Sequence, residues 1–356
     1  MQVNLRTNAA YGIVPLAMLG LFAAYPRKWA PAPAAADCGC SAESIAQANP
    51  PSKMPADSPP RAHDPSMAKE GKTYYVFTTG PGIAVQTSTD RIHWKPAPRV
   101  FTPIPSWTRE TITGSNEFYW APDISYFNHK WHLYYAVSTF GKNRSAIGLA
   151  TNVTLDSTRP DFKWVDEGPV VQSYPKDNYN AIDPVLALDE HKQPWLAFGS
   201  FWGGIQIVRL DEATGKPTEK DLVAPIASRP HTEGQPGAIE APYIIRHGRD
   251  FYLFSSFDFC CRGIRSTYNI RVGRAKSING PYLDRDGKSM LDGGGTQILA
   301  SAGRWYGPGG NSVFREGRTD YLVYHAYDGE DNGAPKLRID ALTWDKDGWP
   351  HAPGGP

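Results

Sequence analysis

The sequence of 356 residues has no excess of charge of either sign. Its 37 lysines and arginines stand against 36 aspartates and glutamates, a formal net charge of +1. A protein that binds nucleic acid usually needs a basic surface, so this balanced composition predicts no nucleic-acid partner. The chain also lacks amphipathic segments with the period of an α-helix, which argues against a helical fold.

Cysteine is scarce. The four cysteines form two close pairs, Cys38 with Cys40 and the adjacent Cys260 and Cys261, which is not the pattern of a disulfide framework. A zinc site would need further ligands at suitable spacing, and none is evident. Adjacent cysteines can close only a small strained ring, so Cys260 and Cys261 are either a vicinal disulfide or two thiols packed near a cleft.

Long apolar runs are also few, and one of them lies at the N-terminus. Arg6 precedes an apolar run over residues 11–25 and a small-residue stretch over 30–36. This pattern predicts a signal peptide over residues 1–36, because the apolar run is short for a membrane span. We therefore expect a secreted protein, extracellular or periplasmic. A retained N-terminal anchor and a disordered apolar leader are the alternatives.

Residues 37–61 are rich in alanine, serine and proline. Such a segment buries too little apolar surface to offset the loss of conformational entropy on folding, so it is predicted to be a disordered linker. The folded domain is then expected over residues 62–356.

Aromatic residues, glycine and proline are abundant in this chain. Aromatic residues make up 12% of it, including 11 tryptophans and 18 tyrosines, beside 34 glycines and 32 prolines. Aromatic residues favour strands, whereas glycine and proline favour turns. The composition thus indicates a turn-rich, all-β protein with surfaces on which a ligand can stack.

An internal repeat sets the architecture. Five segments share an anchor residue, a polar turn and an apolar run that lies twelve residues beyond the anchor: HDPSMAKEGKTYYVF, WAPDISYFNHKWHLY, IDPVLALDEHKQPWL, EAPYIIRHGRDFYLF and GNSVFREGRTDYLVY. Each segment predicts a β-hairpin. A third apolar stretch follows each of them: GIAVQTS, SAIGLAT, GIQIVRL, NIRVGRA and KLRIDAL.

The anchors are Pro65, Pro122, Pro184, Pro242 and Ser312, and successive anchors lie 57, 62, 58 and 70 residues apart. Repeats of three or four antiparallel strands at this period are typical of a β-propeller. We therefore predict an all-β fold, a five-bladed β-propeller. The alternative is a β-sandwich in which the similarity is coincidental.

Acidic residues accompany the anchors. Asp64, Asp183 and Glu240 lie within two residues before anchor prolines in three blades, and Asp123 follows Pro122. The first strand of a propeller blade lines the central channel, so these carboxylates should converge on one axis. Asp-Pro is also an ordinary turn element, but three acids at matching positions in apolar surroundings favour a shared purpose.

Crowded carboxylates push their pKa values apart, so that one stays protonated while another is ionised. A protonated and an ionised carboxyl in a cleft lined by Trp and Tyr are typical of glycoside hydrolases. One group protonates the leaving oxygen and the other activates water. Beside the anchors, Trp120 is the aromatic residue best placed to contact a sugar.

A family resemblance adds to this interpretation. The motifs HDPS, WAPDISY, YAVSTFGKNRSAIGLATN, NAIDP, WLAFGSFWGGI, IEAPYI, FDFCCRG, STYNIRVGRA, MLDGGGT and YLVYHAYDG run from about residue 62 to 350. They resemble glycoside hydrolase family 43, and within it the endo-1,5-α-L-arabinanases. The resemblance implies an inverting endo-hydrolase of α-1,5-L-arabinofuranosidic linkages in arabinan, a side chain of plant cell-wall pectin.

The matching motifs also imply site residues. Asp64 corresponds to the general base, Glu240 to the general acid, and Asp183 to the residue that tunes the pKa of the acid and positions substrate. His325 matches a histidine that reaches one central ion, usually Ca²⁺ and otherwise held mostly by water, with Na⁺ as the alternative. The segments that line the sugar subsites contain Trp120, Gly141, Asn180, Ala181, Ile182, Ser200, Phe201 and Trp202. One departure is Gly203, where a serine is common.

The expected partner is arabinan or arabino-oligosaccharide, bound by a monomer without a stable membrane partner. The three acids do not distinguish an endo-arabinanase from an exo-acting arabinofuranosidase or a β-xylosidase on the same fold. A non-catalytic sugar-binding propeller is the third alternative. The presence of both a base and an acid, Asp64 and Glu240, argues against it.

Overall fold

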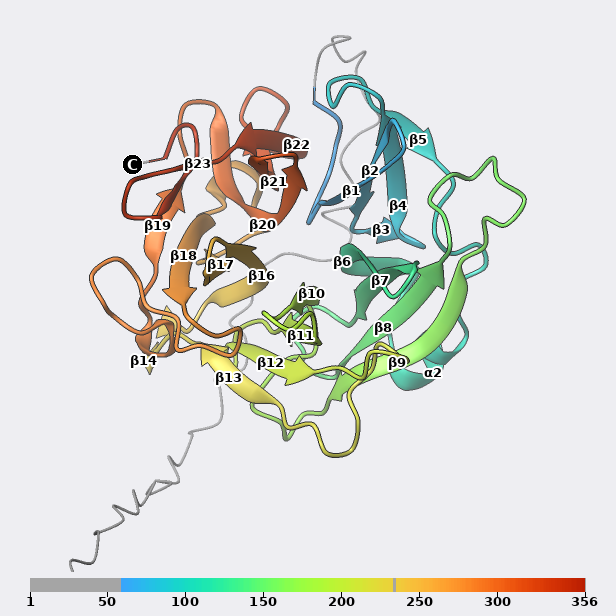
Figure 1. Cartoon of the computed structure of the whole chain (residues 1–356), viewed down its shortest axis with the longest axis horizontal. Helices are drawn as coiled ribbons and strands as arrows, with labels where there is room; N and C mark the ends of the chain where they lie inside the picture. The colour runs from blue at the N-terminus through green and yellow to red at the C-terminus, as the bar shows by residue number, and fades with distance from the viewer. Residues whose placement is uncertain (1–58, 233–234, 356) are drawn as a thin grey trace, which may run out of the picture. The chain divides into compact units, whose positions relative to one another are not determined.

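Five antiparallel sheets follow one another along the chain and surround a common centre in the computed structural model (Figure 1). The model describes residues 59–232 and 235–355. We number the sheets as blades 1 to 5 in chain order. The predicted all-β, five-bladed propeller is confirmed, and the five hairpins begin the five blades as the repeat predicts.

The strands of each blade run in sequence order from the centre outward. Blade 1 consists of β1 (Ser66–Glu70), β2 (Thr73–Thr78), β4 (Ala84–Ser88) and β5 (Lys95–Ala97). Blade 2 consists of β6 (Phe118–Phe127), β7 (Lys130–Val137), β8 (Ser145–Asn152) and β9 (Val165–Ser173), with β3 (Gly80–Pro81) paired to β6. Blade 3 consists of β10 (Val185–Leu188), β11 (Pro194–Phe198), β12 (Ile205–Arg209) and β13 (Ala224–Ala227).

Blade 4 consists of β16 (Ile239–His247), β17 (Asp250–Phe257), β18 (Asn269–Ala275) and β19 (Thr296–Leu299). Blade 5 consists of β20 (Trp305–Glu316), β21 (Thr319–Asp328) and β22 (Ala334–Ala341). Two short hairpins lie outside the blades, β14 (His231–Thr232) with β15 (Gln235–Pro236) and β23 (Thr343–Trp344) with β24 (Pro350–His351). The helical segments of the described residues are α2 (Trp107–Thr111), η1 (Gly263–Arg265) and η2 (Met290–Asp292).

Successive side chains of each strand point to opposite faces, so every blade presents one apolar face to each neighbour. In β2, Tyr75 and Phe77 pack in the cluster between blades 1 and 2, whereas Val76 packs with Val323 between blades 1 and 5. Similar clusters join blades 2 and 3, 3 and 4, and 4 and 5. Because blade 5 also packs on blade 1, the ring of blades is closed.

The chain leading into β1 contributes to this closure. The amide of Ala62 donates to Pro335 O at 3.2 Å, and the amide of Leu337 donates to Pro60 O at 2.9 Å. Arg61 thereby forms an antiparallel bridge with Lys336 in β22, the outer strand of blade 5. The predicted linker was expected to end at residue 61, but its last two residues, Pro60 and Arg61, are already paired with blade 5. Backbone hydrogen bonds hold them there, so their order does not depend on burying apolar side chains.

The predicted signal peptide and residues 37–58 of the predicted linker, which include Cys38 and Cys40, lie outside the described residues. Among the residues that are described, no helix has the length and apolar character needed to cross a membrane.

Candidate active site

The backbone turns sharply at the inner end of every blade. One residue there adopts a left-handed conformation: Asp64 (φ 48°), Ala121 (φ 42°), Asp183 (φ 56°), Ala241 (φ 51°) and Gly310 (φ 55°). Four of them directly precede an anchor proline, although a residue before proline normally favours extended backbone. Strained backbone of this kind clusters at functional sites, where the surrounding structure enforces it.

These turns meet at one small cavity on the axis. It has a volume of about 30 Å³, room for about one water molecule. All five anchors contribute to its lining, which comprises Asp64, Pro65, Ser66, Ala121, Pro122, Asp123, Asp183, Pro184, Ala241, Pro242, Tyr243, Gly310, Asn311 and Ser312. The convergence of the anchors that the repeat predicts is therefore present.

Asp64 is held through one of its two carboxylate oxygens. Oδ2 accepts a hydrogen bond of 2.8 Å from His63 Nδ1 and another of 2.8 Å from Thr79 Oγ1. The Thr79 hydroxyl in turn accepts a hydrogen bond of 2.9 Å from the backbone amide of Ala121, so it links Asp64 in blade 1 to the residue before the anchor of blade 2. The two bonds fix the orientation of the carboxylate.

The other oxygen of Asp64, Oδ1, lies beside Gly310. A Cβ atom at Gly310 would come within 2.3 Å of Oδ1, so only glycine leaves room for the carboxylate there. His325 Nδ1 is 3.7 Å from Oδ1, beyond hydrogen-bond range. Oδ1 is thus the oxygen that can accept a proton from a bound molecule.

The environment keeps Asp64 ionised. Burial acts to raise its pKa, but the charge and hydrogen bond of His63, together with His325 and the hydrogen bond of Thr79, outweigh burial. As a result the pKa of Asp64 falls to about 2. A carboxylate near neutral pH is the form that a general base requires.

The opposite holds for Glu240, the second residue of β16. Burial and the charge of Asp64 raise its pKa to about 7, although the hydrogen bond from Ser200 and the charge of His63 lower it. Ser200 Oγ donates to Oε2 of Glu240 over 2.6 Å, and the glutamate side chain is buried. Glu240 thus carries a proton over much of the range below neutral pH, as a general acid must.

The charges of both other acids act on Asp183. Burial and the charges of Glu240 and Asp64 hold the pKa of Asp183 well above its usual value. Its Oδ2 accepts the amide of Ala241, the residue after Glu240, at 3.0 Å. Asp183 therefore fixes the backbone that carries the acid and shares its electrostatic environment.

Asp123, the fourth anchor acid, has a different role. Its carboxylate accepts hydrogen bonds from Ser66 Oγ, Ser125 Oγ and the amide of Leu186, which come from blades 1, 2 and 3. Burial raises the pKa of Asp123 to about 6, although these three bonds lower it. With its oxygens engaged, Asp123 joins the inner strands.

Four residues of the expected sugar subsites are buried, Ser200 beside Glu240 and three in a row before Asp183. Asn180, Ala181 and Ile182 precede Asp183, and their side chains are nearly inaccessible to solvent. Asn180 Oδ1 accepts from Ser145 Oγ at 2.6 Å, and the Ala181 amide donates to Ser173 Oγ at 2.9 Å. These residues thus belong to the packed wall between blades 2 and 3 that holds Asp183.

Other expected subsite residues are accessible. Trp120 in β6 is half-buried and Gly141, after β7, is exposed in a left-handed turn with φ 72°. Phe201 and Trp202, both half-buried, follow Ser200 with φ 52° and 34°. The Phe201 ring lies 6.0 Å from that of Phe259, which the sequence motifs had not marked as a site residue.

His325 fits the expected ion. The side chain is fully buried, and burial together with the charge of His63 holds its pKa well below the usual value, so the ring is neutral. Its Nε2 atom and the side-chain amide of Asn311 are buried without a hydrogen-bond partner in the described part of the chain. Asn311 lines the axial cavity.

The tautomer of His325 decides what Nε2 offers. Nδ1 accepts the Asp64 amide at 3.2 Å, which places the ring proton on Nε2, where it can donate to water. A ring protonated at Nδ1 would instead offer Nε2 as a ligand to a cation. Either form suits an ion whose shell is mostly water, as the family resemblance implies.

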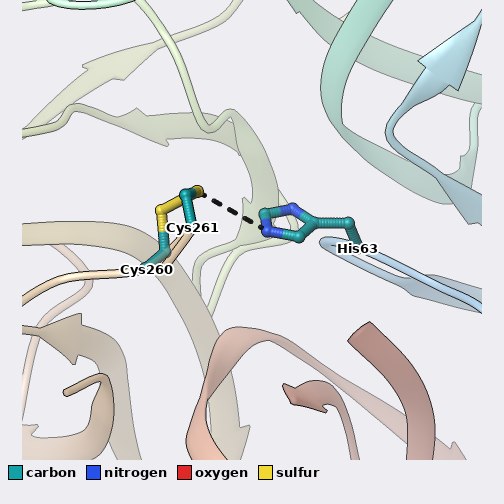
Figure 2. Close-up of side chains that lie close together, drawn as sticks. All are labelled: His63, Cys260 and Cys261. Carbon is teal, nitrogen blue, oxygen red and sulfur yellow. Dashed lines mark hydrogen bonds between the residues drawn. A yellow bond between two sulfur atoms is a disulfide. The ribbon is translucent and has the colours of Figure 1, made fainter. Parts of the chain in front are cut away.

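Sequence reasoning missed several residues around Asp64. His63 lies in the HDPS motif, but nothing in the sequence indicated that its ring stacks on His325 at 3.9 Å or that Nε2 lies 3.0 Å from Tyr327 Oη. Of the alternatives open for Cys260 and Cys261, the structure has the vicinal disulfide, which lies against His63 (Figure 2).

Comparison with known proteins identifies the family of this chain. Residues 58–350 match the family model of glycosyl hydrolases family 43. The chain is 47% identical over 292 residues to the extracellular endo-α-(1→5)-L-arabinanase 1 of Bacillus subtilis, which covers 81% of this chain and 86% of that protein.

The chain is also 44% identical over 295 residues to the extracellular exo-α-(1→5)-L-arabinofuranosidase ArbA of Cellvibrio japonicus, covering 81% of this chain and 85% of that protein. Among solved structures, the α-L-arabinanase of Cellvibrio cellulosa complexed with arabinohexaose superimposes with a TM-score of 0.79. That comparison has 42% sequence identity and covers 83% of this chain and 96% of the other.

Proposed function

This chain belongs to glycosyl hydrolases family 43, and we propose that it is a secreted endo-arabinanase that hydrolyses α-1,5-L-arabinofuranosidic linkages with inversion. Its substrate is arabinan or an arabino-oligosaccharide, bound by a monomer. Relatives named as extracellular support secretion, and a relative solved with arabinohexaose supports the substrate class.

The observation that carries the catalytic part of this proposal is the contrast between Asp64 and Glu240. The pKa of one is lowered to about 2 and that of the other raised to about 7, while the charge of Asp64 still acts on Glu240. Around neutral pH the site therefore holds an ionised and a protonated carboxyl together. Inverting hydrolysis needs this combination, one group on either side of the scissile bond.

In the proposed mechanism, Asp64 Oδ1 accepts a proton from a water molecule while the water oxygen attacks the anomeric carbon. The glycosidic C–O bond breaks, and Glu240 gives its proton to the leaving oxygen. Asp183 supports the acid by holding the amide of Ala241, the residue after Glu240, and the charge of Glu240 in turn raises the pKa of Asp183. Proton exchange with solvent then restores both carboxyls.

The central ion is part of this proposal. His325 and surrounding water would hold it, with Ca²⁺ as the expected ion and Na⁺ as the alternative, and it would supply fixed positive charge near the carboxylates. Trp120, Gly141, Ser200, Phe201 and Trp202 would line the sugar subsites. Asn180, Ala181 and Ile182 would support them from within the wall.

An exo-acting arabinofuranosidase is the second candidate, because one relative of 44% identity carries that name. Chromatography of the products from debranched linear arabinan over time separates the two. For an endo-enzyme, early products are a spread of oligosaccharides and viscosity falls before much reducing sugar appears. Release of one short product from chain ends, with viscosity maintained, would assign the exo mode. An inactive protein that only binds arabinan would be the non-catalytic alternative.

A further inference from the structure

A continuous line of contacts joins the vicinal disulfide to Asp64. The amide of Cys261 donates to Tyr327 Oη at 2.7 Å, and Tyr327 Oη lies 3.0 Å from His63 Nε2. His63 Nδ1 then bonds Asp64 Oδ2 at 2.8 Å. Cys261 Sγ also lies 3.8 Å from His63 Nε2, the contact drawn in Figure 2.

The groups in this line form a continuous series of hydrogen bonds. Asp64 as a carboxylate can only accept, so the hydrogen between it and His63 belongs to Nδ1. His63 Nε2 and the Tyr327 hydroxyl share the next hydrogen bond, in which Nε2 is the donor when the ring is charged and the acceptor when it is neutral. The hydroxyl oxygen in turn accepts the Cys261 amide. Each group orients the next, and the series ends at Oδ2 of Asp64, the oxygen that does not take the proton of the attacking water.

The disulfide limits how the Cys261 amide can move. Cys260 and Cys261 are consecutive residues joined through their sulfurs, so the ring restricts the backbone of both. Cys261 is held with φ 66°, a conformation that non-glycine residues seldom adopt. Breaking the ring would free this backbone and with it the donor to Tyr327.

We propose that the Cys260–Cys261 disulfide and Tyr327 are a positioning assembly for Asp64, in which the disulfide fixes the Cys261 amide on the Tyr327 hydroxyl and this hydroxyl orients His63. The assembly rests on the proposed function, since it presupposes that Asp64 is the general base. It acts through the orientation of Asp64 and not through contact with the sugar, so it supports kcat more than KM.

The first variant is Tyr327→Phe, which keeps the buried ring and removes the hydroxyl. We expect kcat on debranched arabinan to fall about tenfold or more, because a small displacement of a catalytic group is costly, while KM changes less than about twofold. Tyr282→Phe is the matched control. It also removes a buried hydroxyl, which donates to Ile278 O at 2.7 Å in blade 4, and it should leave kcat unchanged.

The second perturbation is opening of the ring, by Cys260→Ser with Cys261→Ser or by dithiothreitol. Two electrons and two protons pass from the dithiol to the disulfide, which gives two cysteine thiols and a cyclic dithiothreitol disulfide. Both cysteines are half-buried, within reach of a small reductant. A Cys38→Ser, Cys40→Ser background assigns the effect of the reductant to Cys260 and Cys261.

The decisive measurement combines the Tyr327→Phe variant with opening of the disulfide ring. If the disulfide acts through the Tyr327 hydroxyl, ring opening lowers kcat by a factor similar to that of Tyr327→Phe and has little further effect in the Tyr327→Phe protein. Multiplying effects, unchanged kcat after ring opening, or a rise in KM alone would each overturn the proposal. The unmodified enzyme and Asp64→Asn are assayed in parallel. An inactive unmodified enzyme, or an active Asp64→Asn protein, would overturn the proposed function itself.

Discussion

Ser200 Oγ donates a hydrogen bond of 2.6 Å to Oε2 of Glu240, although the two residues are 40 positions apart. This bond stabilises the ionised form of the glutamate and lowers its pKa, against burial, which raises the pKa to about 7. The serine thereby lowers the upper pH limit at which the acid still carries its proton.

The first prediction concerns Ser200→Ala. Removing the donor destabilises the carboxylate, so the pKa of Glu240 rises above about 7 and the alkaline limb of activity moves to higher pH. The measurement is kcat/KM on debranched arabinan from pH 4 to about 10. Ser88→Ala, which removes a buried hydroxyl in β4 that bonds Asp90, should leave the limb in place. An alkaline limb shifted to lower pH would contradict the assignment.

The second prediction concerns the three acids. Asp64→Asn, Asp183→Asn and Glu240→Gln should each lower kcat by about a hundredfold to ten-thousandfold, the range for general acid and base groups, with the fold retained. Turnover and circular dichroism check this. Near-normal turnover of Glu240→Gln would mean that the acid lies elsewhere.

Asp123→Asn is the matched control for these variants, since Asp123 lines the same cavity as Asp64 and Asp183 and holds three inner strands. We expect it to lower the melting temperature more than it lowers turnover, because it disturbs buried hydrogen bonds and no reacting group. A collapse of kcat with an unchanged melting temperature would give Asp123 a part in the chemistry.

The third prediction concerns Gly310→Ala. The new Cβ would lie 2.3 Å from Asp64 Oδ1 and displace the oxygen assigned to the attacking water, so kcat should fall about a hundredfold. Gly317→Ala is the control, because Gly317 has φ 60° in the hairpin of the same blade and nothing within 4 Å of the added Cβ. It introduces the same backbone strain without the contact. Equal kinetics of the two variants would remove Gly310 from the site.

The fourth prediction concerns the central ion. Chelation or His325→Ala should lower turnover more than it lowers the melting temperature, because an ion held mostly by water contributes little to folding. Elemental analysis of the active protein should find one ion that His325→Ala loses. His132→Ala, another buried histidine, should keep it. Active protein without bound ion, together with full activity of His325→Ala, would return His325 to the ordinary core.

The sequence by itself determined the number of blades and the acids at their inner ends. Each blade begins with a hairpin whose turn and alternating side chains are local, so five copies of one pattern suffice to predict five sheets. Because the anchors occupy the same position in every copy, their convergence at the axis also followed from the pattern, as the lining of the cavity confirms.

Only the tertiary structure decided what those acids can do. The pKa of a carboxyl depends on its burial and on charges and donors that the fold brings near it. His325, 261 positions from Asp64, Ser200 beside Glu240, and Tyr327 behind His63 come from other blades or other strands than the acids they act on. No local pattern predicts such pairs, because their spacing along the chain is set by how the blades close into a ring.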